Sequence, residues 1–183
     1  MATIRALKFH GGVTKEDLNR ENLAALDSGF ANLERHYRNI TDHYGLPCIV
    51  CINHFTFDTE AEIALLQEKC KALGAACIVS RHWAEGGRGA ENLAREVIAV
   101  AESGEPGCRY VYEEDQSLWS KIETIATKLY GASGITAGAK VRAQLSAWDR
   151  DYRSFPVCIA KTQMSFSTDP AVKGAPTGHT LEI

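Results

Sequence analysis

Two short apolar runs, each closed by a large aromatic ring, constrain the fold of this chain more than any other feature. The first run spans residues 48–55 and ends on Phe55, and the second spans residues 76–83 and ends on Trp83. Continuous apolar runs of this length are typical of strands buried in a parallel sheet. Helix-like segments follow both runs, so we expect both rings at the carboxyl ends of parallel strands that are neighbours or one strand apart, where ligands of open α/β sheets bind.

The two rings leave two interpretations open. Phe55 and Trp83 can sandwich a flat heterocycle, because an offset aromatic stack contributes about 0.5–1.5 kcal/mol beyond the burial of surface area. They can also be loop anchors that pack on the sheet and bind nothing.

Composition indicates an ordinary globular chain. Its 183 residues, of which 45% are hydrophobic and 23% charged, allow one sizeable core or slightly more. The formal net charge of −3 provides no basic field to attract nucleic acid or an acidic membrane. Apolar runs are far shorter than the roughly 20 residues that cross a bilayer, and no apolar signal segment opens the sequence. We expect a cytoplasmic chain without nucleic-acid or membrane partners, and its start is typical of an excised fragment with an added Met.

Cysteine spacing gives no strong site. Cys48 and Cys51 form a CxxC pair, but residues three apart on a strand point to opposite faces. No second CxxC completes a zinc site. We therefore expect free, largely buried thiols in a reducing compartment, and no metal site.

The first part of the chain alternates between strand-like and helix-like patterns. We predict strands over residues 3–9, 48–55 and 76–83, and helices over 22–43, 60–73 and 90–102. In the last helix, the inward residues should be Leu93, Val97, Ile98 and Ala101. This alternation predicts an α/β fold in which a parallel sheet of βαβ units is flanked by helices. Residues 1–105 are expected to form this domain.

Residues 106–183 are expected to form a smaller and less regular α/β segment. Helical spacing appears over 117–129 and 139–148, and a last buried strand is predicted over 155–160. That strand runs into three polar residues, Lys161, Thr162 and Gln163. A cation beside hydroxyl and amide groups suits a phosphate or carboxylate, so these three are candidate anion or nucleotide-side residues. The alternative is a polar strand end without a ligand.

No Gly-x-x-x-x-Gly-Lys-Ser/Thr phosphate loop occurs in the sequence. The Gly-rich segment 86–89 can hold an anion at a helix N-terminus, or it can be a plain flexible loop. The strand ends at Asn53 and Ser80 are similar to the base-reading strand ends of P-loop GTPases, although His54 replaces their Lys. This similarity predicts a P-loop-NTPase-like core that lacks its phosphate loop, and it does not support guanine recognition.

Several segments together resemble the formate–tetrahydrofolate ligase family, also called formyltetrahydrofolate synthetase. Residues 2–12, ATIRALKFHGG, resemble one of the two signature motifs of that family, with Met1 where Val usually precedes Ala2. Further matching segments lie at residues 29–33, 58–62, 83–87, 121–126 and 160–163. The resemblance covers essentially the whole chain and corresponds to the C-terminal part, short of the extreme end, of a considerably longer enzyme.

The resemblance implies an ATP-dependent ligase of one-carbon metabolism, which joins formate to N10 of tetrahydrofolate through formyl phosphate. It implies that Phe55 and Trp83 sandwich the folate pterin and that Val79 lines the same slot. From its position after the first ring, Asp58 is a candidate partner for the polar edge of the pterin. ATP and tetrahydrofolate are then substrates of the full enzyme, which also uses Mg²⁺.

The phosphate loop and the Mg²⁺ and phosphate ligands of the family lie upstream and are absent from this sequence. We therefore expect no catalytic residue here, no tightly bound cofactor, and no activity of the chain alone. The implied partners are the rest of the ligase chain and further copies in a tetramer. The alternatives are a stand-alone pterin- or nucleotide-binding module without catalysis, and an inert α/β subunit of an oligomer.

Overall fold

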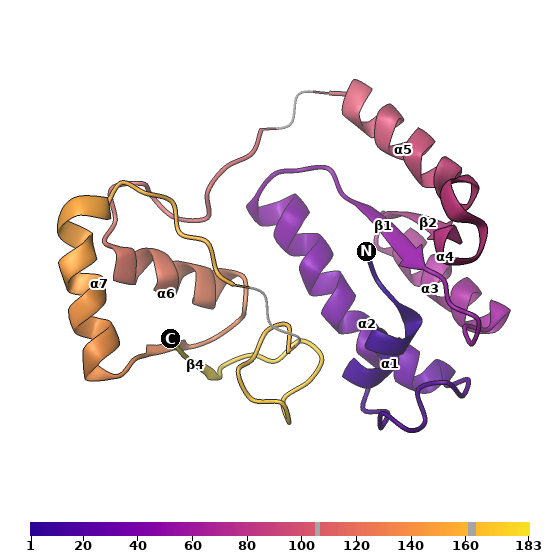
Figure 1. The fold of residues 1–183 in the computed structure, drawn as a ribbon, viewed down its shortest axis with the longest axis horizontal. Coiled ribbons are helices and arrows are strands. Elements are labelled where there is room, and N and C mark those ends of the chain that lie inside the picture. Colours follow the sequence, from indigo (N-terminus) through magenta and orange to yellow (C-terminus); the bar gives the residue numbers. More distant parts are fainter. Residues whose placement is uncertain (105–106, 161–163) are drawn as a thin grey trace. The chain divides into compact units, whose positions relative to one another are not determined.

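A computed structural model describes residues 1–104, 107–160 and 164–183. The fold is α/β with small parallel sheets, as the alternation of patterns predicts. The chain divides into two compact units, unit 1 (Met1–Cys108) and unit 2 (Arg109–Ile183). Figure 1 colours the chain along its sequence, from indigo at the N-terminus to yellow at the C-terminus.

The sheet of unit 1 confirms that the two apolar runs form parallel strands, and it makes them direct neighbours. Strand β1 (Ile49–Asn53) and strand β2 (Ala76–Ser80) lie side by side in Figure 1, in a register that places Asn53 opposite Ser80. Ala2 adds one more parallel bridge, on β1 at Ile52. Its N–H donates to the carbonyl of Cys51 and its carbonyl accepts from Asn53 N–H, both at 2.8 Å.

Helices and one short π-helical turn surround these strands. In chain order they are α1 (Ile4–His10), α2 (Leu23–Arg38), η1 (Asn39–His43), α3 (Glu60–Ala72), α4 (His82–Glu85), the 3₁₀ helix η2 (Gly86–Ala90) and α5 (Glu91–Glu102). The core combines residues of α1, α2, β1 and α3 with Ala75, which directly precedes β2: Ile4, Leu7, Leu26, Phe30, Val50, Ile52, Ile63, Leu66, Cys70 and Ala75.

The prediction of a strand over residues 3–9 is wrong, because this segment forms α1. Thr3 is the N-cap, and its side-chain oxygen accepts a hydrogen bond from Ala6 N–H at 3.1 Å. Ile4, Leu7 and Lys8 are buried, and their spacing of three and four residues places them on one helical face. A short apolar run does not by itself separate a strand from a buried helix.

The second apolar run ends earlier than predicted, so Trp83 lies on α4 and not at the end of a strand. Arg81 N–H donates to the carbonyl of Gly89 at 2.9 Å, which closes the turn after β2. A Cβ atom at Gly89 would stand 2.5 Å from the carbonyl carbon of Arg81. Residues 86–90 form the short 3₁₀ helix η2.

Helix α5 forms where the spacing predicts it, but its apolar side does not face inward as predicted. Val97 is 49% exposed and Ile98 is 55% exposed, and Ala101 is exposed as well. The helix packs on β2 and β1, and Leu93 is only half-buried. Within the described part of the chain, nothing covers the Val97–Ile98 side.

Unit 2 is built on two helices and a two-stranded parallel sheet. Its elements are α6 (Leu118–Lys128), β3 (Gly134–Thr136), α7 (Ala139–Tyr152) and β4 (Thr180–Glu182). Both helices were predicted from their spacing, whereas the sheet was not. In the described ranges of both units, no helix is long and apolar enough to cross a membrane.

The prediction of a buried strand over residues 155–160 is wrong. Phe155 is 57% exposed, Ile159 is 37% exposed, and Cys158 is exposed. A continuous apolar run is buried as a strand only between neighbours on both faces, and no described strand pairs with this segment. Its best anchor is the N–H of Val157, which donates to the hydroxyl of Tyr112 at 2.8 Å.

Candidate functional site

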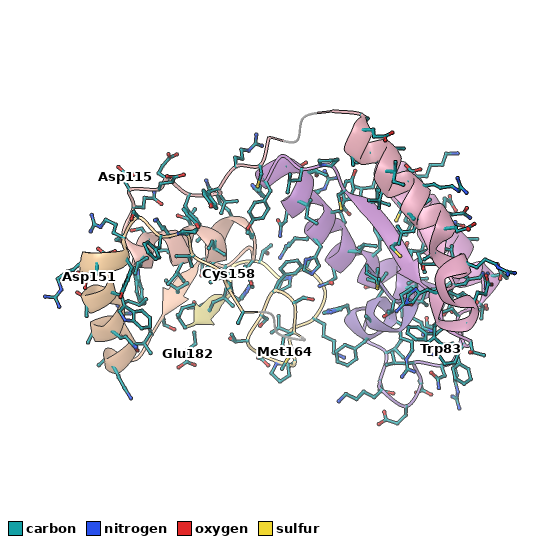
Figure 2. All side chains as sticks on the ribbon, turned by 45° about the horizontal axis from the view of Figure 1, so that its top comes forward. Trp83, Asp115, Asp151, Cys158, Met164 and Glu182 are labelled. Atoms are coloured by element: carbon teal, nitrogen blue, oxygen red, sulfur yellow. The ribbon has the colours of Figure 1, made fainter. Side chains whose placement is uncertain are left out.

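Two side-chain contacts join the segments that follow β1 and β2. The rings of Phe55 and Trp83 lie 6.4 Å apart, centroid to centroid, at an interplanar angle of 52°. Beside them, Arg81 Nη1 donates to His54 Nε2 at 3.1 Å. We call His54, Phe55, Asp58, Arg81 and Trp83 the strand-end site. Figure 2 shows Trp83 at the periphery of unit 1.

The ring pair faces solvent, since Trp83 is 66% exposed and Phe55 is half-buried. A flat ligand between two rings needs two stacking gaps of about 3.5–4 Å each, and rings that are nearly parallel. At 6.4 Å and 52° the rings touch each other directly. A ligand therefore enters this pair only if the rings separate and turn.

Asp58 holds the backbone that carries the first ring. Its Oδ2 accepts from Phe55 N–H at 2.8 Å, and its own N–H donates to the carbonyl of Phe55 at 3.0 Å. The carboxyl group is buried, and this burial raises the pKa of Asp58, while the hydrogen bond from Phe55 acts in the opposite direction. Asp58 is thus a buried carboxylate beside the ring pair.

Arg81 is held between two partners on the other side of the site. Besides His54, its Nη2 lies 3.4 Å from Oε1 of Glu60, the first residue of α3. The side chain of Arg81 is 39% exposed and that of Glu60 is 85% exposed. This ion pair is long and solvated, and it contributes little to stability.

Val79 has different surroundings from the two rings. It packs against the core of unit 1 and lines an open groove of about 610 Å³ with Cys77, Ile78 and residues of α3 and α5. Neither Phe55 nor Trp83 is among the described residues that line this groove. The structure brings the two rings together, but gives no contact that joins Val79 to them.

Asn53 belongs to the site region although sequence reasoning did not select it as a candidate. It ends β1, and its Oδ1 is buried without a hydrogen-bond donor among the described residues. Buried polar atoms nearly always have a partner, so this atom is an exception. No sequence pattern marks an acceptor of this kind, because its lack of a donor follows only from the packing.

Lys161, Thr162 and Gln163 lie outside the described residues. Over residues 1–104, 107–160 and 164–183, no three His, Cys, Asp or Glu residues gather in a way that could hold a metal ion. The chemistry of the strand-end site is therefore that of stacking, hydrogen bonding and charge pairing.

Comparison with known proteins gives one consistent result. The sequence model of the family described as formate–tetrahydrofolate ligase matches residues 1–183. Three similar curated proteins carry the same name. The one from Methylococcus capsulatus is 66% identical over 183 residues, and that from Methylibium petroleiphilum is 54% identical over 187. The one from Methylobacillus flagellatus is 47% identical over 184 residues. Each match covers 100% of this chain and 33% of the relative, so the chain spans about a third of the length of these relatives.

Proposed function

The chain belongs to the formate–tetrahydrofolate ligase family, and we propose that it forms the folate-binding part of such a ligase. The full enzyme would join formate to N10 of tetrahydrofolate with ATP cleavage, through formyl phosphate, in one-carbon metabolism. This chain would correspond to the C-terminal part. It would be inactive alone, because the groups that stabilise phosphoryl transfer would lie in the rest of the ligase.

The pair of Phe55 and Trp83 carries this proposal. Both rings follow parallel strands of one sheet, at the edge where α/β folds bind ligands. A pterin is flat, apolar on its faces and polar at its edges. Once the rings separate, it would cover the exposed face of Trp83, an arrangement that resembles base–aromatic stacking.

Three further residues have proposed roles around the pterin. Asp58 would offer its carboxylate to N–H donors at the pterin edge, which its burial beside Phe55 supports. Val79 would line the same slot, and this requires the slot to reach toward the groove along β2. Asn53, whose buried Oδ1 has no described donor, is a second acceptor at this strand end.

The other parts of the proposal concern the full enzyme. Lys161, Thr162 and Gln163 would lie on the nucleotide side, and Mg²⁺ would be held by residues outside this chain. The partners would be the rest of the ligase and further copies in a tetramer, in the cytoplasm. The surface of α5 around Val97 and Ile98 is apolar enough to suit such a protein contact.

Calorimetric titration with tetrahydrofolate tests the folate-binding role. Trp83→Ala should weaken binding roughly 5- to 150-fold, since a stacked base contributes about 1–3 kcal/mol. Phe55→Ala should act in the same direction. Trp148→Ala removes another exposed tryptophan, in unit 2, and should leave the affinity unchanged. Undiminished binding by a folded Trp83→Ala variant would exclude the sandwich.

A further inference from the structure

We propose that Arg81, held by His54, is a carboxylate-binding subsite beside the aromatic pair. The inference rests on the proposed function, because the ligand is one whose rings stack on Phe55 and Trp83. Its carboxylate would belong to the glutamyl tail of a folate or would arrive separately as formate. In the structure, the carboxylate of Glu60 lies against this guanidinium.

The guanidinium of Arg81 is positioned from two directions. The backbone N–H of Arg81 donates to the carbonyl of Gly89 at 2.9 Å, which fixes the residue between β2 and α4. Its Nη1 donates to Nε2 of His54 at 3.1 Å. The same Nη1 lies 3.5 Å from Nδ1 of His54, so the guanidinium rests against the imidazole edge.

This position lies next to both rings in the sequence and in space. His54 directly precedes Phe55, and Arg81 stands two residues before Trp83. The His54–Arg81 and Phe55–Trp83 contacts therefore bridge the same two segments side by side. A ligand that stacks on the rings would bring its substituents toward the guanidinium.

The chemistry of the guanidinium selects a carboxylate. Arginine presents five N–H donors in a planar fork that matches the two oxygens of a carboxylate. In the structure, Oε1 of Glu60 lies 3.4 Å from Nη2. At 85% exposure, Glu60 can turn into solvent at little cost and free the fork.

The neighbouring charges require that Glu60 leaves when a ligand arrives. Asp58 is the other carboxylate of the site, and it stays bound to Phe55 N–H. An incoming carboxylate beside Glu60 would place two like charges on one guanidinium. Exchange with Glu60 keeps the charge on Arg81 balanced. The proposed exchange therefore implies that loss of Arg81 weakens ligand binding and that loss of Glu60 strengthens it.

Titration of the 183-residue chain with two ligands tests this exchange. The ligands are tetrahydrofolate and its diamide, in which both glutamyl carboxylates are amides while the rings are unchanged. Arg81→Gln should weaken binding of tetrahydrofolate about three- to tenfold and leave the diamide unaffected. Glu60→Gln should strengthen binding of tetrahydrofolate about twofold, with no change for the diamide. Arg88→Gln removes the same charge from the adjacent helix η2 and should change neither.

A formate titration separates the two sources of the carboxylate. Formate is the occupant if formate alone binds to the parent chain and Arg81→Gln abolishes this binding. In that case the ratio of the affinities for tetrahydrofolate and the diamide is the same in the parent chain and in Arg81→Gln. If Arg81→Gln changes this ratio of affinities, the glutamyl tail is the occupant. Since Glu60→Gln leaves Arg81 in place, it supplies the answer if Arg81→Gln fails to fold.

Equal affinity for tetrahydrofolate and the diamide in every variant, with formate binding insensitive to Arg81, would overturn the subsite and leave the folate-binding proposal intact. If the parent chain binds neither tetrahydrofolate nor its diamide, both proposals are contradicted.

Discussion

Lys8 Nζ lies 2.8 Å from Glu62 Oε1 in the interior of unit 1, where the two side chains are 1% and 0% exposed. Nζ also donates to the carbonyl of Arg20 at 2.8 Å. Glu62 in turn accepts from the N–H groups of Asn22 at 3.0 Å and Thr59 at 3.2 Å. The pair thus connects α1, the loop before α2, and the start of α3.

Breaking this pair from one side should destabilise the protein strongly. Glu62→Gln preserves the shape but leaves the Lys8 ammonium buried without a counter-charge, which should cost about 3–5 kcal/mol of unfolding free energy. The double variant Lys8→Met/Glu62→Leu removes both charges and should be clearly more stable than Glu62→Gln. Urea unfolding measures both. Equal losses in the two variants would show that the cost comes from packing and not from the uncompensated charge.

The same carboxyl group should make stability depend on pH. Burial alone would raise its pKa, but hydrogen bonds from Lys8, Asn22 and Thr59 hold the pKa of Glu62 below its usual value. Because the folded pKa lies below the unfolded one, the contribution is fully present above the unfolded pKa of about 4.3. It is lost as the pH falls through the folded pKa. The stability difference between the parent chain and Glu62→Gln should therefore shrink on acidification, and a constant difference would contradict this linkage.

Close contact between α1 and α2 depends on glycine. A Cβ at Gly29 would stand 1.8 Å from the carbonyl oxygen of Leu7, a backbone atom that cannot turn aside. Gly29→Ala should therefore lower the unfolding free energy by about 1–3 kcal/mol or more, as overpacking does. Gly87→Ala is the matched control, since its Cβ would meet nothing within 4 Å. Thermal melts of both variants check this, and similar melting temperatures would argue against the close contact.

The sequence predicts those elements whose signals are local. Helix α3 begins at the capping box of Thr59 and Glu62, as its pattern indicates. The parallel pairing of β1 and β2 follows from two apolar runs separated by a helix. Phe55 and Trp83 meet because both follow these strands.

The structure differs from the sequence-based predictions where contacts between distant parts of the chain determine the local structure. The apolar pattern of residues 3–9 is compatible with either a strand or a buried helix, and the Thr3 cap selects the helix. Residues 155–160 are apolar enough for a strand, but no described strand pairs with them. Whether Oδ1 of Asn53 has a hydrogen-bond donor depends on the residues that surround it in space, and among the described residues it has none. The periodicity of the sequence carries no information on this.

The cysteines should be reduced and should differ in reactivity. All six are free thiols, with Cys108 and Cys158 exposed and Cys51 and Cys70 buried. Burial raises the pKa of Cys51, which further lowers its thiolate fraction. Under native conditions an alkylating reagent should therefore modify the exposed pair first and the buried pair only after unfolding. Mass spectrometry of the unreduced protein provides the test, and a Cys48–Cys51 disulfide would conflict with the β1 assignment.

The isolated chain should form no 10-formyltetrahydrofolate from ATP, formate and tetrahydrofolate. Phosphoryl transfer needs donors and a metal ion that neutralise charge on the transferred group. The sequence contains no phosphate loop, and the described residues hold no cluster for a metal ion. Binding of tetrahydrofolate without turnover is the expected result, and a product assay beside the calorimetric titration separates the two properties. ATP- and formate-dependent product from the purified chain would show that it carries catalytic groups beyond the strand-end site.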